Sequence, residues 1–174
     1  MHVDEKEILI SQEEIQERVK ELGQQISQDY AGKRPLLVCV LKGAVIFLAD
    51  FIRSLDFPME IDFMATSSYG SSTKSSGVVR ILKDLETPVE DRHIIIVEDI
   101  IDTGLTLKYL AENIVSRGPA SLKIVTLLDK PSRRKVDIEA HYTGFKIPDK
   151  FVVGYGLDFN EDYRQLPAVY VLKE

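Results

Sequence analysis

The chain has 174 residues, of which 44% are hydrophobic and 29% charged, the usage of an ordinary globular domain. A formal net charge of −6 and a pI of about 5.2 argue against a nucleic-acid binder, which needs a basic surface to replace phosphate counterions. The N-terminus is polar, no apolar run could span a bilayer, and a single cysteine excludes an intramolecular disulfide, so we expect a cytoplasmic protein without nucleic-acid or membrane partners.

The N-terminal part of the chain predicts a helix, a buried strand and a second helix. Ser11-Gln12-Glu13-Glu14 is a capping-box pattern, in which Ser11 and Glu14 each satisfy a backbone N–H of the other. Leu36–Leu41 is a continuously apolar run typical of a strand covered on both faces, and Ala44–Ile52 is typical of a largely buried helix. Four apolar residues recur at helical spacing after the capping box: Ile15, Val19, Leu22 and Ile26.

The rest of the chain alternates strands with helical segments. His93–Val97 is a second fully apolar strand, with Glu98 and Asp99 at its carboxyl end, and Gly118-Pro119 supplies the stop of a following helix. A small, polar segment lies at 67–77. The other predicted elements are strands at 59–65, 78–82, 122–128, 151–153 and 168–172 and a helix at 103–117.

This order of elements predicts the fold class. Strands that alternate with helices indicate an α/β domain with a central, mostly parallel sheet and helices on both faces. The terminal segments are less regular and would form a small lobe over the sheet edge. We therefore predict one domain over residues 1–174, with a core at about 33–130 and a hood from the N-terminal segment and about 131–174.

The most informative stretch joins the strand at 93–97 to the helix at 103–117, and it reads Glu98-Asp99-Ile100-Ile101-Asp102-Thr103-Gly104-Leu105-Thr106. Ligands in open α/β sheets bind at the carboxyl ends of strands, and helix N-termini hold anions through free N–H groups and the helix dipole. We therefore expect a phosphate against the backbone N–H groups of 102–106. Glu98 and Asp99 would face hydroxyl groups or a metal attached to that phosphate.

An ordinary turn between a strand and a helix is the alternative for this stretch. Capping by Asp and Thr would account well for Thr103 and Gly104. It accounts poorly for three acids within five residues, Glu98, Asp99 and Asp102, because like charges repel unless a cation or hydroxyl groups neutralise them. The pattern therefore favours a site for a sugar phosphate.

The run as a whole resembles the phosphoribosyl pyrophosphate signature of the type I phosphoribosyltransferases: four apolar residues, two acids, two apolar residues, then Asp-Thr-Gly-x-Thr. Other stretches are similar to the bacterial hypoxanthine-guanine branch of that family, in consistent order over nearly the full chain. These stretches are Leu41-Lys42-Gly43, Ser68-Tyr69, Leu128-Asp129-Lys130-Pro131, the run 148–156, Leu157-Asp158 and Arg164.

The resemblance implies a purine salvage transferase. It would join hypoxanthine, and guanine as a second base, to phosphoribosyl pyrophosphate, giving inosine or guanosine monophosphate and pyrophosphate. Mg²⁺ is the implied cofactor, and family analogy suggests a homodimer or homotetramer. The fold implied by the family is the α/β fold that the strand and helix order predicts.

The resemblance also implies a role for each matching residue. Asp102 would be the catalytic residue that handles the proton on purine N7, and the ribose phosphate would be bound by Glu98, Asp99, Asp102, Thr103, Gly104, Leu105 and Thr106. A loop with an expected cis peptide before Lys42, a lid and an arginine would bind pyrophosphate: Leu41, Lys42, Gly43, Ser68, Tyr69 and Arg164. The purine would contact Lys130, Phe151, Val152 and Asp158, and the metal would be held by Glu98, Asp99 and Asp158.

Each motif outside the phosphate loop also has a plainer interpretation. Lys42 alone would be a surface lysine at a strand end, and Phe151 and Val152 would be strand core. Asp158 and Arg164 would be an exposed ion pair of little energetic value. We interpret the basic run at 133–135 as a solvated turn rather than a nucleic-acid patch.

Three other functions compete with the hypoxanthine-guanine reaction. A phosphoryl-receiver module would share the strand-end carboxylates and a lysine, but the loop 103–106 directly after them fits a sugar phosphate better. A sister enzyme that accepts xanthine would carry the same phosphate loop. A regulatory protein that senses phosphoribosyl pyrophosphate and binds RNA or DNA through the same fold would carry it too. The net acidity of the chain argues against the regulator, and Asp102, Lys130 and Asp158 together argue for catalysis.

Overall fold

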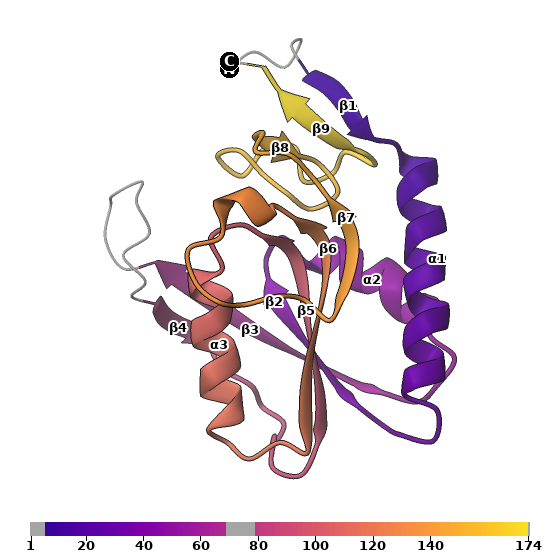
Figure 1. The fold of residues 1–174 in the computed structure, drawn as a ribbon, viewed down its shortest axis with the longest axis vertical. Helices are drawn as coiled ribbons and strands as arrows, with labels where there is room; N and C mark the ends of the chain where they lie inside the picture. The colour runs from indigo at the N-terminus through magenta and orange to yellow at the C-terminus, as the bar shows by residue number, and fades with distance from the viewer. Residues whose placement is uncertain (1–5, 69–78, 174) are drawn as a thin grey trace.

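The computed structural model describes residues 6–68 and 79–173 and shows an α/β fold with two sheets (Figure 1). Within these residues the main sheet has six strands in the order β4-β3-β2-β5-β6-β7. Every neighbouring pair is parallel except β3 and β4, which confirms the predicted, mostly parallel sheet. The strands are β2 (Leu36–Leu41), β3 (Glu60–Ser68), β4 (Val79–Lys83), β5 (His93–Ile101), β6 (Ser121–Asp129) and β7 (Tyr142–Lys146).

Helices cover both faces of the main sheet, as predicted. Helices α1 (Gln12–Asp29) and α2 (Val45–Arg53) pack on one face and α3 (Leu105–Val115) on the other (Figure 1). Because successive side chains of a strand point to opposite faces, the continuously apolar strands feed two cores. Leu37, Cys39, Ile95 and Val97 join the core under α1 and α2, whereas Leu36, Val38, Ile94 and Ile96 join the core under α3.

The first helix begins where its capping box predicts. The Ser11 hydroxyl accepts a hydrogen bond from the Glu14 N–H at 3.1 Å, and the Glu14 carboxylate accepts one from the Ser11 N–H at 3.5 Å. The helix then buries the residues that recur at helical spacing, namely Ile15, Val19, Leu22 and Ile26. The local pattern and the packing therefore agree along this whole element.

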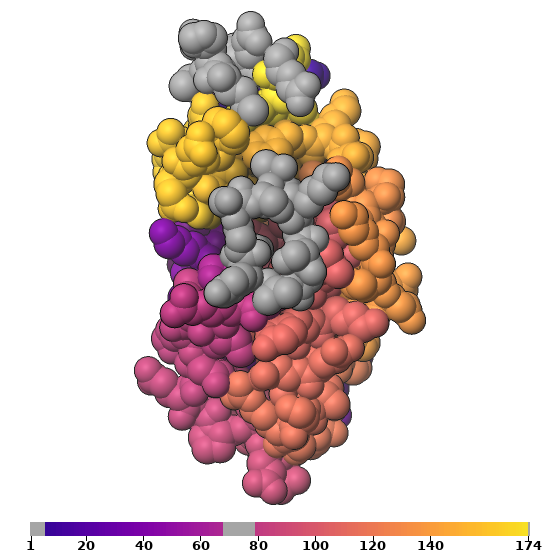
Figure 2. Space-filling view, turned by 90° about the vertical axis from the view of Figure 1, so that its left-hand side faces the viewer, coloured from indigo at the N-terminus to yellow at the C-terminus, as the bar shows by residue number. Residues whose placement is uncertain are grey.

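A second sheet of order β1-β9-β8 forms the hood at one end of the molecule. It is built from β1 (Lys6–Ile10), β8 (Val152–Val153) and β9 (Val169–Leu172). In the space-filling view the C-terminal segments of the hood lie above the face that carries β3, β4 and α3 (Figure 2). Strand β7 belongs to the main sheet instead, so this sheet continues beyond residue 130.

The centre of the main sheet is the point where the strand order reverses. From the adjacent parallel strands β2 and β5, the chain continues to β3 on one side and to β6 on the other. Ligands of open α/β sheets bind outside the carboxyl ends of strands at such a switch point. None of the described helices is long and apolar enough to cross a membrane.

Candidate active site

Three segments meet beyond the carboxyl ends of β2 and β5. A Cβ on Gly43, directly after β2, would overlap Asp99 Oδ2 and lie 2.9 Å from Asp99 Cγ. A Cβ on Gly156 would in turn overlap the carbonyl oxygen of Gly43. Because glycine has no Cβ at these two positions, the predicted pyrophosphate loop, β5 and the 156 loop come into direct contact. The peptide between Leu41 and Lys42 is cis, as the resemblance predicts.

The loop between β5 and α3 surrounds a small cavity. Strand β5 continues to Ile101, so Glu98 and Asp99 lie within the strand and not beyond its end, because the chain keeps pairing with β6 as far as Asp129. Gly104 is the N-cap of α3 with φ of 84°, a left-handed conformation that favours glycine. The cavity has a volume of about 160 Å³ and is lined by Glu98, Ile100, Ile101, Asp102, Thr103, Gly104, Thr106 and Leu107.

This cavity gathers most of the residues predicted to hold the ribose phosphate. Asp99 and Leu105 are the predicted members that do not line it. The Thr103 hydroxyl accepts a hydrogen bond from the Leu105 N–H at 3.3 Å, so part of the plainer capping interpretation also holds. The backbone N–H groups of the first turn of α3 face a space of suitable size for an anion.

Of the two adjacent acids of β5, Glu98 is buried and Asp99 is partly buried. Burial, followed by repulsion from Asp99, raises the pKa of Glu98 well above its usual range. Burial also raises the pKa of Asp99, and a hydrogen bond from the Ile100 N–H at 2.7 Å opposes this rise. None of the salt bridges of the described residues includes either carboxylate. The pair therefore suits a ligand that brings hydroxyl donors or a cation.

The donor set also decides which kind of metal site is compatible. Among the described residues, no three His, Cys, Asp or Glu side chains form a group that could hold a metal alone. The Asp158 carboxylate contacts residues of its own segment: it lies 3.5 Å from Arg164 Nη2 and accepts a hydrogen bond from the Glu161 N–H at 2.9 Å. Mg²⁺ commonly takes one or two carboxylates and completes its shell with water and substrate oxygens, so the residues fit such a shared site.

Asp102 and Lys130 come together because they follow neighbouring strands. Ile101 of β5 is in register with Asp129 of β6, so the next residue of each strand faces the same end of the sheet. Lys130 is 6% exposed, and its Nζ lies 3.9 Å from Asp102 Oδ2. Arg133 Nε donates to Asp102 Oδ1 at 3.1 Å, so the carboxylate of Asp102 lies between two cations.

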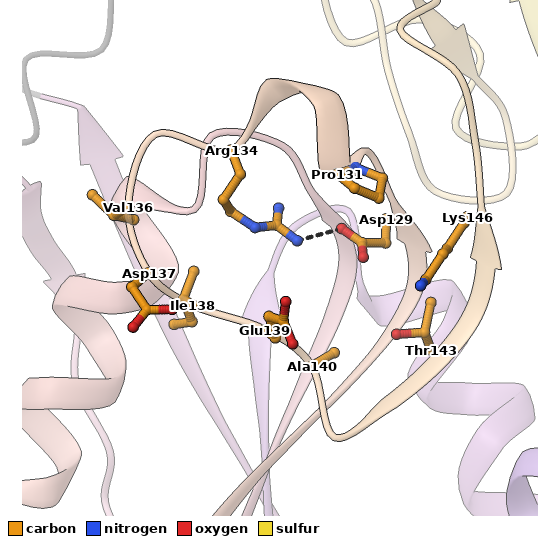
Figure 3. Close-up of a pocket in the computed structure, with 10 residues that line it drawn as sticks. All are labelled: Asp129, Pro131, Arg134, Val136, Asp137, Ile138, Glu139, Ala140, Thr143 and Lys146. Atoms are coloured by element: carbon orange, nitrogen blue, oxygen red, sulfur yellow. Dashed lines mark hydrogen bonds and ion pairs between the residues drawn. The ribbon is translucent and has the colours of Figure 1, made fainter.

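The basic run at 133–135 is exposed at Arg133 and Lys135, as the predicted solvated turn would be, but Arg134 is turned inward. Arg134 Nη1 donates to the Asp102 carbonyl oxygen at 2.8 Å, and Nη2 donates to Asp129 Oδ1 at 2.5 Å. Both side chains of this ion pair are largely buried. Figure 3 shows them pointing toward each other at a separate cavity of about 230 Å³. Asp129 is the sequence feature that points to this ion pair, because a carboxylate at the end of an apolar strand needs a buried partner.

Two of the predicted purine-binding residues, Phe151 and Val152, differ in how exposed their side chains are. Phe151 is 46% exposed and contacts Phe159 edge to face, with ring centroids 5.7 Å apart, so it is not the core residue of the plainer interpretation. Val152 is buried in β8, where it pairs with Val171. The preceding loop is tied to β6, because the Ile147 N–H donates to the Asp129 carbonyl oxygen at 2.8 Å.

The predicted pyrophosphate cations converge on a residue that sequence reasoning missed. Lys42 Nζ lies 3.1 Å from Glu161 Oε2, and Arg164 Nη2 lies 3.2 Å from Glu161 Oε1. Arg164 Nη1 donates to the Gly156 carbonyl oxygen at 2.7 Å. Ser68 is the last residue of β3, and Tyr69 lies outside the described residues. No sequence pattern singles out Glu161 from the other acids of the C-terminal segment.

Comparisons with known proteins match this geometry to a family. The phosphoribosyl transferase domain model matches residues 8–160. A hypoxanthine-guanine phosphoribosyltransferase of Streptococcus thermophilus is 58% identical over 171 residues, which cover 98% of this chain and 95% of that protein. The enzyme of the same name from Bacillus subtilis is 58% identical over 173 residues, covering 99% and 96%. A crystal structure of a hypoxanthine phosphoribosyltransferase from Staphylococcus aureus has a TM-score of 0.95 at 53% identity, covering 99% and 94%.

Proposed function

This chain belongs to the phosphoribosyl transferase domain family, and from that membership we propose that it is a purine salvage enzyme. It joins hypoxanthine, and guanine as a second base, to phosphoribosyl pyrophosphate and releases pyrophosphate. The observation that carries this function is the phosphate cavity, with Glu98 on one side and the pair of Asp102 and Lys130 beside it. The names of the near full-length relatives favour this reaction over a xanthine-type enzyme or a regulatory protein.

The site supports a displacement at ribose C1. The 5-phosphate accepts hydrogen bonds from backbone N–H groups of 103–106, and the ribose hydroxyls donate to Glu98 and Asp99. A purine nitrogen forms its bond to C1 while the bond from C1 to the pyrophosphate oxygen breaks. The sugar passes through a cationic state that nearby carboxylates stabilise, so the protein acts mainly by position and charge.

Asp102 and Lys130 act on the base. The carboxylate of Asp102 accepts the proton that leaves purine N7 as the new bond forms. The Lys130 ammonium donates to the 6-oxo group, which selects oxopurines over adenine because the amino group of adenine is a donor. Phe151 offers an exposed ring face on which the base stacks, and the backbone of Val152 reads the base edge.

Pyrophosphate is bound at the other side of the sugar. Lys42 and Arg164 supply its cations, and the loop from Leu41 to Gly43 supplies backbone groups. Glu98 and Asp99 would hold one Mg²⁺ with substrate oxygens, and Asp158 a second. When bound, the metal would neutralise charge on pyrophosphate and make it a better leaving group. Family analogy supports a homodimer or homotetramer in the cytoplasm.

An assay of four bases tests the function. The protein is incubated with phosphoribosyl pyrophosphate, Mg²⁺ and either hypoxanthine, guanine, xanthine or adenine, and nucleotide formation is followed by chromatography. We expect nucleotide from hypoxanthine and guanine and far less from adenine. Nucleotide from none of the bases would refute the enzyme function. A preference for xanthine would favour the sister enzyme, and turnover of adenine without hypoxanthine would refute the role of Lys130.

A further inference from the structure

One carboxylate bridges the two cations of the pyrophosphate region. Glu161 Oε2 lies 3.1 Å from Lys42 Nζ, and Glu161 Oε1 lies 3.2 Å from Arg164 Nη2. Lys42 follows β2, whereas Glu161 and Arg164 belong to the C-terminal segment, so the contact joins distant parts of the chain. The carboxylate presents one oxygen to each cation, which is how an oxyanion of pyrophosphate would engage them.

The turn that carries Glu161 is unfavourable for a glutamate. Asn160 and Glu161 have φ of 52° and 70°, and reciprocal backbone hydrogen bonds of 3.1 and 3.0 Å join Phe159 and Asp162 around them. Two-residue turns with positive φ at both central positions favour Asn followed by Gly. Asn160 fits this preference and Glu161 does not. A non-glycine residue persists in such a conformation where its surroundings hold it, and here its side chain contacts both cations.

The charge of Glu161 and the incomplete hydrogen bonding of Arg164 would both allow pyrophosphate to replace Glu161. The Glu161 carboxylate accepts hydrogen bonds from Lys42 Nζ and Arg164 Nη2, and a glutamate side chain is charged at neutral pH. Arg164 Nε is buried and has no hydrogen-bond acceptor among the described residues, so Glu161 and Gly156 leave part of the guanidinium unsatisfied. An anion with more oxygens could satisfy it better.

We propose that Glu161 is an internal substitute for pyrophosphate, which holds Lys42 and Arg164 together in the ligand-free site and is displaced when pyrophosphate or its ribose derivative binds. This inference rests on the proposed function, because it takes Lys42 and Arg164 as pyrophosphate ligands. Glu161 is a positioning residue: it keeps two long side chains ordered, and it competes with the incoming anion. The same competition speeds the release of pyrophosphate after the reaction.

Pyrophosphate binding to Glu161→Gln tests the proposal. Titration calorimetry with pyrophosphate and Mg²⁺ should show binding about three- to tenfold tighter than in the wild type, the range expected when one or two exposed ion pairs no longer compete. The KM for phosphoribosyl pyrophosphate should fall with it, while the KM for hypoxanthine stays unchanged. A role in the turn alone would not separate these two KM values.

Two further variants make the outcome decisive. Asp162→Asn removes the same charge from the next, exposed position of the turn, and its pyrophosphate affinity should stay within about twofold of the wild type. Glu161→Gly removes the carboxylate and relieves the positive φ, so it should bind pyrophosphate as tightly as the Gln variant and be more stable. Unchanged or weaker binding by both Glu161 variants, or an equal gain in Asp162→Asn, would overturn the proposal. Absence of binding by the wild type would refute the proposed function itself.

Discussion

At the scale of single residues, Asp102 is the side chain on which the proposed chemistry depends most. Its carboxylate lies 3.1 Å from Arg133 Nε and 3.9 Å from Lys130 Nζ, and Arg134 binds its carbonyl oxygen at 2.8 Å. Side chain and backbone of one residue are therefore fixed by three cations. Such support places a proton acceptor in a defined position before the base arrives.

Replacement of Asp102 by Asn should separate catalysis from binding. The amide keeps the shape of the side chain but cannot take up the proton, so we expect kcat to fall by about 10²- to 10⁴-fold, the usual contribution of general acid–base catalysis. The affinity for phosphoribosyl pyrophosphate, measured by calorimetry, should change little. An equal loss of turnover and affinity would show that Asp102 only binds substrate.

Replacement of Arg134 by Met should affect both stability and turnover. It leaves the carboxylate of Asp129 buried without its partner, which costs about 3–5 kcal/mol in comparable buried pairs. Combining it with Asp129→Asn should restore most of the free energy of unfolding in urea melts. The kcat should stay low in both variants, because the Asp102 carbonyl oxygen still lacks its donor. Recovery of both quantities in the double variant would show that Arg134 has no role in positioning Asp102.

Sequence patterns identify single residues only where the chain itself carries the geometry. The phosphate loop could be predicted because its acids, threonines and glycine are consecutive, and the cavity gathers most of them. The partners of Asp102 and the contacts of Glu161 could not be predicted from the sequence. They depend on which of several charged side chains the tertiary fold brings to the site. The structural positions of the predicted residues are consistent with their proposed roles, which the variants above would test.

At the scale of elements, the site depends on close contact between the loop after β2 and the end of β5. Gly43 and Asp99 are in contact because glycine leaves room for the carboxylate. Gly156 permits the same approach from the C-terminal segment. These contacts determine how the acids of β5 are oriented relative to the predicted pyrophosphate loop.

Replacement of Gly43 by Ala should impair binding more than folding. The new methyl group would overlap the Asp99 carboxylate, and this flexible group can turn aside without a large loss of stability. We expect the KM for phosphoribosyl pyrophosphate to rise about tenfold or more, since positioning errors of this size are costly. Thermal unfolding serves as the control, and a large fall in Tm with unchanged KM would contradict the prediction.

The loop between β4 and β5 depends on the ionisation of Asp62. Its buried carboxylate accepts hydrogen bonds from the backbone N–H groups of Phe63 at 2.8 Å and of Glu86 and Thr87 at 2.9 Å. Burial alone would raise the pKa of Asp62, but the hydrogen bonds from Thr87, Phe63 and Glu86 outweigh it and lower the pKa. The charged form is therefore favoured by folding.

This lowered pKa predicts an acid-dependent loss of stability. Asp62 stabilises the folded state above its unfolded-state pKa of about 3.9, and that contribution disappears as the pH falls through the lower folded-state pKa. Asp62→Asn should reduce the free energy of unfolding by about 1–3 kcal/mol at pH 7. In urea melts the difference from the wild type should shrink as the pH drops below about 4. A difference that is independent of pH would contradict the prediction.

The elements themselves differ in how well the sequence predicts them. Long periodic or fully apolar segments, such as α1 and β5, were found because burial determines their pattern. The sequence does not predict strands β1 and β7, because only Ile10 of β1 and Tyr142 of β7 are buried and β7 carries a glycine. The sequence predicts that β5 ends at Val97, because two acids follow the apolar run, whereas the strand continues to Ile101. Pairing with β6 decides that end.

At the scale of the whole molecule, the fold brings residues from four separate segments to one edge of the main sheet. These segments follow β2, β5 and β6 or belong to the C-terminal loop before β9. Parallel strands place their carboxyl ends together, so the gathering of these segments at one edge follows from the parallel sheet that the sequence predicts. The exact sheet order, the pairing of β1 with β9 and the second cavity behind Asp129 could not be predicted, because they arise from long-range contacts.

The most direct test of the account is a crystal structure of the protein with inosine monophosphate. We predict the phosphate in the cavity formed by residues 102–106, the ribose hydroxyls at Glu98 and Asp99, and the 6-oxo group within hydrogen-bond distance of Lys130 Nζ. A nucleotide whose phosphate lies elsewhere, for example in the cavity behind Asp129, with the 102–106 cavity filled by protein side chains, would contradict the account.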